Sequence, residues 1–149
     1  MLSLAVRNTG KLIREKSKSD NVRLGRLFTK KDTAALMAGM LRLDEAKTVF
    51  TVLDPGAGTG ILTAAVIERI CKERPACREI FVTCYENNPD FIPMLQDNLE
   101  RVRKKARHDY DVRVYVTIYE ENYTFWPRRS HRCQHGNGYC AGTCQEDGR

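Results

Sequence analysis

The chain has 149 residues, enough for about one domain with its own hydrophobic core. Apolar residues make up 42% of the sequence, which argues against an intrinsically disordered protein. No apolar run is long enough to cross a bilayer, and no apolar signal core follows the basic N-terminus. We therefore expect a cytoplasmic protein with no membrane partner. The net charge of +6 favours anionic partners, including nucleic acid.

The positive charge is concentrated in two segments of the chain. One comprises the first 31 residues, and the other is the short run at residues 101–107. Two interpretations remain open at this point, because such runs form either solvated helix faces or surfaces that bind nucleic acid.

The six cysteines do not suggest a disulfide scaffold. Cys71 and Cys84 lie in apolar segments, where a free thiol behaves as a small hydrophobic side chain, and we expect reduced thiols. Near the C-terminus, histidines and cysteines follow the spacing His-x-Cys-x-His-x4-Cys-x3-Cys from His131 to Cys144. Common zinc fingers have paired Cys-x2-Cys units instead, so we expect no metal.

Hydrophobic periodicity predicts helices and strands in alternation. In chain order we expect a helix at 2–19, a loop at 24–29, a helix at about 31–43, a strand at 48–53, a helix at about 60–73, a strand at 79–85, a helix opened by Asn88-Pro89-Asp90 and extending to about residue 107, and a strand at 111–119. In the helix at 31–43, the residues Ala34, Met37, Ala38 and Leu41 share one face.

This alternation predicts an α/β fold with a parallel, Rossmann-like sheet. The pattern stops after the third strand, so the sheet looks truncated there. Residues 126–149 hold four glycines and almost no aliphatic residue, which predicts a disordered tail. We therefore divide the chain into a basic helical extension at 1–23, a Rossmann-like half-domain at 24–125, and the tail at 126–149.

A glycine-rich loop connects the first predicted strand to the following helix. It consists of Asp54, Pro55, Gly56, Ala57, Gly58, Thr59 and Gly60. Glycines allow a tight turn and let a cofactor approach the backbone. The spacing Gly-x-Gly-x-Gly is not the Gly-x-Gly-x-x-Gly of dinucleotide sites, and the Lys-Ser/Thr pair of a P-loop is missing. An acidic residue at the mouth of the loop suits a cationic ligand, so we expect S-adenosyl-L-methionine, with Glu86 accepting hydrogen bonds from its ribose.

Residues 25–123 resemble the N-terminal half of an N6-adenine DNA methyltransferase of the restriction-modification type. Residues 24–29 are similar to the family's upstream cofactor segment, although Lys30 stands where the family usually continues with proline. Residues 53–60 are similar to its first Rossmann motif. The resemblance implies that S-adenosylmethionine contacts Phe28 and Thr29 upstream, the loop at 54–60, and Glu86 and Asn87 at the ribose. Asn122 and Tyr123 stand where the family has an Asp-Phe pair at the adenine.

The resemblance also implies a catalytic Asn-Pro-Pro-Tyr motif after a fourth strand, which accepts hydrogen bonds from a flipped adenine. The sequence has no Pro-Pro pair, and its nearest match, Asn137-Gly138-Tyr139, lacks both prolines. The catalytic residues are therefore unknown, and we expect a catalytically incomplete methyltransferase. DNA is the substrate implied for the full-length family member, and a partner chain is one way to complete the sheet.

Two other functions remain open. The chain could be a nucleic-acid-binding fragment without enzymatic activity, which would use its two basic segments. It could also belong to a methyltransferase that acts on RNA or protein, because different enzymes of this kind share the cofactor-binding half.

Overall fold

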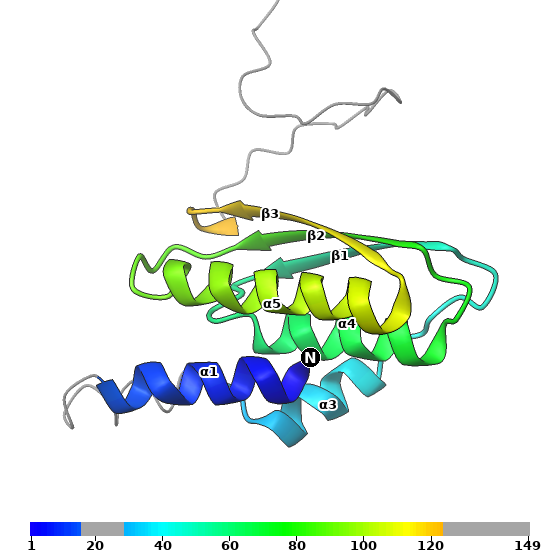
Figure 1. Ribbon diagram of the computed structural model, residues 1–149. Coiled ribbons are helices and arrows are strands. Elements are labelled where there is room, and N and C mark those ends of the chain that lie inside the picture. The colour runs from blue at the N-terminus through cyan, green and yellow to red at the C-terminus, as the bar shows by residue number, and fades with distance from the viewer. Residues whose placement is uncertain (16–28, 124–149) are drawn as a thin grey trace, which may run out of the picture.

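The computed structural model describes residues 1–15 and 29–123 of the chain (Figure 1). Helices and strands alternate through most of this part. In chain order they are α1 (Leu2–Glu15), α3 (Lys31–Gly39), β1 (Val49–Pro55), α4 (Ile61–Glu73), β2 (Glu79–Tyr85), α5 (Ile92–Tyr110) and β3 (Arg113–Tyr119).

The three strands form one parallel sheet in the order β1-β2-β3. In the register of the sheet, Val49 pairs with Glu79, and Glu79 pairs with Arg113. The pairing continues residue by residue, without a bulge, to the carboxyl ends of the strands. Parallel neighbours need a crossover connection, and α4 and α5 provide the two crossovers. The expectation of an α/β fold with a parallel sheet is confirmed.

The described elements lie in three layers, with the sheet above α4 and α5 and with α1 and α3 below these two helices (Figure 1). The face of the sheet that is covered by α4 and α5 carries Ile80 and Val82, which are almost completely buried. Ile67 of α4 and Leu95 of α5 are also fully buried. The segment predicted as an N-terminal extension begins inside this core, because Ala5 of α1 belongs to the same buried cluster.

The opposite face of the sheet is open within the described part of the chain. It presents Val49, Leu53, Phe81 and Tyr115, each of which keeps 42–50% of its surface exposed. The rings of Phe81 and Tyr115 stack with their centroids 4.9 Å apart. Parallel sheets are normally covered on both faces, so this apolar face is unusual.

The helix α3 ends at Gly39, four residues before the predicted end. The guanidinium of Arg69 donates hydrogen bonds to the carbonyl oxygens of Ala38 and Leu41, the latter at 2.8 Å. These bonds satisfy carbonyl groups that a continuing helix would have used itself. The predicted shared face is also only half correct, because Ala34 and Ala38 are buried whereas Met37 and Leu41 are exposed.

The helix α5 begins at Ile92, and Pro93 rather than Pro89 occupies its first turn. The preceding residues form a turn in which the Asn88 side chain accepts a hydrogen bond from the Asp90 amide at 3.0 Å. At its other end α5 extends to Tyr110, and Asp111 then adopts a left-handed conformation with φ of 56°. The third strand consequently begins at residue 113 instead of 111.

Cys71, Cys77 and Cys84 are buried free thiols, in agreement with the expected reduced state. Burial raises the pKa of the Cys71 and Cys84 thiols to about 12, which keeps both protonated. In residues 1–15 and 29–123, no three metal-binding side chains cluster together, and no helix is both long and apolar enough to cross a membrane. The histidines and cysteines from His131 onward lie outside the described residues.

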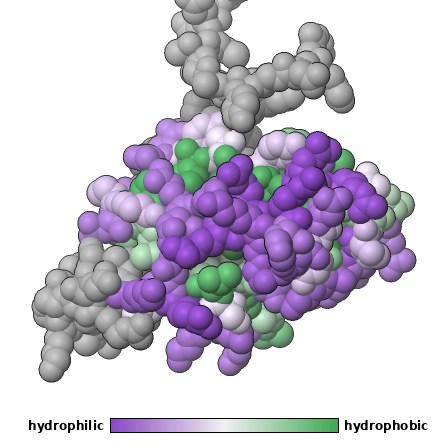
Figure 2. All heavy atoms as spheres, viewed as in Figure 1, coloured by the Kyte–Doolittle hydropathy of each residue, from purple (hydrophilic) through white to green (hydrophobic). Residues whose placement is uncertain are grey.

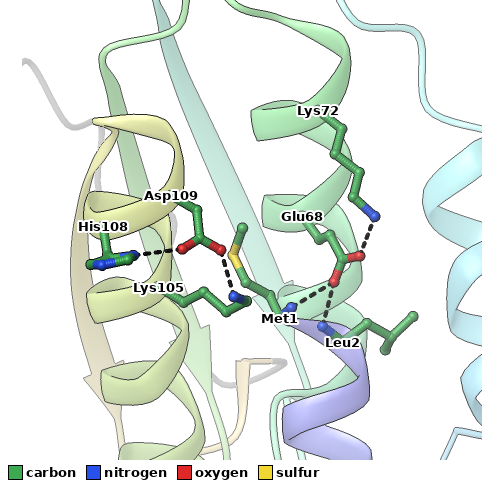
Figure 3. A network of polar contacts seen from close by, with 7 residues as sticks. All are labelled: Met1, Leu2, Glu68, Lys72, Lys105, His108 and Asp109. Carbon is green, nitrogen blue, oxygen red and sulfur yellow. Dashed lines mark hydrogen bonds and ion pairs between the residues drawn. The ribbon is translucent and has the colours of Figure 1, made fainter.

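A charged cluster fastens the start of α1 to α4 (Figure 3). The Glu68 carboxylate accepts hydrogen bonds from the Leu2 amide at 2.6 Å and from Lys72 Nζ at 2.5 Å. It also forms an ion pair with the N-terminal ammonium of Met1 at 2.8 Å. Burial alone would raise the pKa of Glu68, but these three partners stabilise the carboxylate and lower its pKa from 4.5 to about 2.

We expect Glu68→Gln to lower the melting temperature at neutral pH. A pKa that is lower in the folded state than in the unfolded state stabilises the protein above pH 4.5, and this stabilisation is lost as the pH falls towards 2. The difference between the wild type and Glu68→Gln should therefore shrink below pH 4.5 in thermal melts at several pH values. Glu73→Gln is the matched control, because it breaks only an exposed pair with Arg69. Equal effects of both variants would show that Glu68 contributes no more than an exposed ion pair does.

Candidate cofactor site

The glycine loop between β1 and α4 depends on three glycines with positive φ. The φ angles are 121° at Gly56, 54° at Gly58 and 78° at Gly60, a region that other residues rarely adopt. A Cβ atom on Gly60 would lie 2.9 Å from Leu95 Cδ1, so this glycine also permits the close approach of α5. In contrast, a Cβ atom on Gly56 or Gly58 would meet nothing within 4 Å. The loop is therefore packed at its Gly60 end and open at Gly56 and Gly58.

Most of the loop amides point into the protein. The amides of Gly56 and Ala57 both donate to the carbonyl oxygen of Tyr85 at 2.9 Å, and the Gly60 amide donates to the Ala57 carbonyl oxygen at 2.8 Å. The Gly58 amide donates to Glu86 Oε2 at 2.7 Å. Phosphate-binding loops instead direct their amides outward at the anion. These four amides are not available for that purpose.

Glu86 lies just after β2 and connects three parts of the site. Its Oε2 accepts the bond from Gly58, and its Oε1 accepts a bond from the Asn88 amide at 2.7 Å. The Glu86 backbone amide donates to the Tyr119 carbonyl oxygen at 3.0 Å, at the end of β3. Only 7% of Glu86 is exposed. This carboxylate therefore holds the glycine loop, β2 and the turn before α5 in one arrangement.

The side chain of Asp54 lies on a different side of the glycine loop from the side chain of Glu86. Its Oδ2 accepts a hydrogen bond from the Thr63 hydroxyl at 2.5 Å, and the Thr63 backbone also bonds to the carboxylate, at the start of α4. Burial raises the pKa of Asp54, the bonds from Thr63 oppose this rise, and the negative charge of Glu86 adds to it. Asp54 faces a groove along β1, whereas Glu86 faces a separate small cavity.

The small cavity beside Glu86 has a volume of about 80 Å³. It brings together residues from the ends of all three strands. Its lining comprises Pro55, Gly56, Tyr85, Glu86, Asn87, Glu121, Asn122 and Tyr123. Six of these residues were predicted from the sequence, and Tyr85 and Glu121 were not. Tyr85 contacts the ring of Tyr123 edge-to-face at 5.0 Å between centroids, a contact that alternation along a strand does not signal.

The other predicted site residues lie away from this cavity. Thr59 is 2% exposed and faces α1 and α5. Ala57 is buried, and Gly60 packs against α5. Thr29 lies just before α3, partly buried and outside the cavity lining. Phe28 lies outside the described residues.

A buried polar network fixes the second half of the loop. The Asn98 amide group donates to the Thr59 carbonyl oxygen at 2.8 Å and to Thr9 Oγ1 at 3.4 Å, while the Thr9 hydroxyl donates to the Thr59 hydroxyl at 2.9 Å. Asn8 donates to Asn98 Oδ1 at 2.9 Å. Thr9, Thr59 and Asn98 are each at most 2% exposed. Sequence periodicity missed this network, which joins α1, the loop and α5.

Acidic side chains collect at the carboxyl end of the sheet. This end comprises residues 54–60, 86–91 and 119–123, and it carries no lysine or arginine. Its acidic residues are Asp54, Glu86, Asp90, Glu120 and Glu121. The local potential therefore favours a cation over an anion at this edge.

The second basic segment lies on α5, where its charges are neutralised locally. Each basic residue from 101 to 107 forms an ion pair with an acid three or four residues away along the helix. The pairs are Arg101–Asp97, Arg103–Glu100, Lys104–Glu100, Lys105–Asp109 and Arg107–Asp111. The surface over α5 is strongly hydrophilic (Figure 2). This arrangement favours the interpretation of residues 101–107 as a solvated helix face.

No family model matches the chain, and no significant match was found among curated proteins or solved structures. The candidate site therefore rests on the geometry of the described residues and on the sequence motif.

We expect Asn98→Ala to loosen the glycine loop. The substitution removes the donor to the Thr59 carbonyl group in a buried environment, which typically costs about 1–3 kcal/mol of folding free energy. Denaturant unfolding should report this loss, and hydrogen exchange should show faster exchange of the amides at residues 58–60. Gln96→Ala, on the exposed side of the same helix, is the control. Unchanged exchange at residues 58–60 in Asn98→Ala would refute the role of the network.

Proposed function

We propose that the chain binds S-adenosyl-L-methionine and forms the cofactor-binding half of a Rossmann-like, class I methyltransferase. The observation that carries this proposal is the direction of the loop amides. The amides of Gly56, Ala57 and Gly58 donate to the Tyr85 carbonyl oxygen and to Glu86. A loop whose amides are already bonded inside the protein offers few donors to a ligand, which disfavours a pyrophosphate.

The charge at the carboxyl end of the sheet supports the same ligand class. S-adenosylmethionine carries a sulfonium and an ammonium group, and ligands of open α/β sheets bind beyond the carboxyl ends of the strands. Burial raises the pKa of Asp54, and the negative charge of Glu86 adds to this rise. A cation near the loop would offset this repulsion at Asp54.

The residues of the site fit the parts of the cofactor separately. Each oxygen of Glu86 accepts one backbone bond and retains capacity for a ribose hydroxyl. The cavity bounded by Asn122 and Tyr123 would receive the adenine side, and it is smaller than typical whole-ligand pockets. The methionine part of the cofactor would lie across the open side of the loop at Gly56 and Gly58, with its amino and carboxylate groups towards Asp54.

Methyl transfer needs a target nitrogen held in line with the sulfonium methyl group. The Asn-Pro-Pro-Tyr motif that would hold an adenine is missing from the sequence. We therefore propose cofactor binding without methyl transfer by this chain alone. The resemblance to DNA adenine-N6 methyltransferases makes DNA the proposed substrate of a completed enzyme, and methylation of RNA or protein is the competing outcome.

Calorimetric titration with S-adenosylmethionine tests the proposal. We expect the wild type to bind it more tightly than S-adenosylhomocysteine, which lacks the sulfonium charge. Glu86→Gln should weaken binding at least about tenfold, or about 1.4 kcal/mol. Glu120→Gln is the control, because Glu120 carries the same charge at the same edge but does not line the cavity. Folded wild type that gives neither heat nor a thermal shift with either compound would end the proposal.

The affinity for S-adenosylmethionine should rise with pH as Asp54 ionises. Burial raises the pKa of Asp54 above its ordinary value, so this side chain stays protonated to a higher pH than an exposed aspartate and attracts a cation less strongly while it is neutral. Titrations between about pH 4 and pH 7 should show this increase, and Asp54→Asn should flatten it. The same slope in Asp54→Asn and in the wild type would show that another group is responsible.

A further inference from the structure

The outer edge of β1 has no neighbouring strand among the described residues, and a groove of about 850 Å³ runs along it. The walls of the groove are largely apolar. They include Phe50 and Val52 of β1, Leu62 and Val66 of α4, and Met37 at the end of α3. An open strand edge beside an apolar groove is a template for pairing with another chain.

We propose that a second copy of this chain occupies this edge, so that two β1 strands pair in antiparallel orientation about a two-fold axis at Thr51. The two sheets then become one continuous sheet of six strands, and the two grooves meet beneath it. An isologous contact of this kind uses the same surface on both copies and closes without forming a fibre. The proposal goes beyond cofactor binding and does not depend on it.

The sequence of β1 is self-complementary in this register. Residues directly opposite one another in an antiparallel pair place their side chains on the same face. With Thr51 opposite Thr51 of the second copy, Val49 lies opposite Leu53 on the open face of the sheet, and Phe50 lies opposite Val52 on the groove face. Shifting the centre to Val52 would instead place Phe50 opposite Asp54. The centre at Thr51 is therefore the favoured register.

The charges at the two ends of the groove support the same orientation. Arg42, Asp44 and Lys47 lie at the end where β1 begins, which leaves that end with a net positive charge, and Asp54 lies at the end where β1 stops. Antiparallel pairing places the end with the two cations beside the acidic end of the other copy, whereas parallel pairing would place like ends together. Opposite charges across a contact favour this orientation over the parallel one.

The C-terminal segment of the same chain is a poorer occupant on grounds of composition. Residues 124–149 contain no valine, isoleucine, leucine or methionine. The strand-forming side chains of this segment are concentrated at Thr124, Phe125 and Trp126, and Pro127 ends that run. A second β1 provides them in the required alternation.

Analytical ultracentrifugation without cofactor tests the proposal. We expect the wild type to shift with concentration from 17.1 kDa towards twice that mass. Val49→Lys alone and Leu53→Glu alone should each weaken the dimer at least about tenfold, because each places a charge opposite an apolar side chain. Combining the two substitutions should recover most of the loss, because each introduced lysine then faces an introduced glutamate of the other copy.

Tyr115→Lys is the matched control, because Tyr115 is 43% exposed on the same face of the sheet, as Val49 is, but lies on β3. Its dimer constant should equal that of the wild type, and far-ultraviolet circular dichroism should show that every variant is folded. A wild type that stays monomeric up to about 100 µM would overturn the proposal. So would a double variant that dimerises no better than the single variants. Since no S-adenosylmethionine is present, either result leaves the proposed function untouched.

Discussion

The arrangement of the candidate site depends on one carboxylate. Glu86 accepts the amide of Gly58 on one oxygen and the amide of Asn88 on the other, and its own amide bonds to the end of β3. Charge-assisted hydrogen bonds of this length are among the stronger polar contacts in a protein interior. Through them a single side chain sets the shape of the glycine loop and the course of the chain into α5. The same carboxylate is also the proposed hydrogen-bond acceptor for the ribose. Glu86 would therefore both hold the glycine loop in place and bind the cofactor.

Much of the architecture could be predicted from the sequence because it follows from local patterns. The alternation of helices and strands, the bend at Gly56–Gly60 and the burial of Cys71 all depend on residue types that act close to their own position in the chain. Six residues of the cavity beside Glu86 were named from the sequence, but Asn87, Asn122 and Tyr123 were named only through the family resemblance. Parallel strands bring their carboxyl ends to one edge, so residues that follow β1, β2 and β3 meet there.

The features that could not be predicted from the sequence depend on partners far away in the chain. The end of α3 is decided by Arg69 of α4, and the position of Thr59 by Asn98 of α5. Asp54 was expected at the mouth of the loop, yet its carboxylate bonds to Thr63 and is 8% exposed. Periodicity describes which face of an element is apolar. It does not tell which polar side chain will reach across to a neighbouring element.

The network around Thr59 also bears on the order of events in folding. Asn8 and Asn98 are 90 residues apart in the chain, and contacts of such separation form only after a costly loop closure. Thr9 of α1 bonds directly to Thr59, but the loop receives the bond from Asn98 only when α5 has been synthesised and packed. When the ribosome has released only the first two strands, the Thr59 carbonyl oxygen would therefore still lack its bond from Asn98. The ability to bind a ligand would therefore appear late in folding, when the whole core has packed.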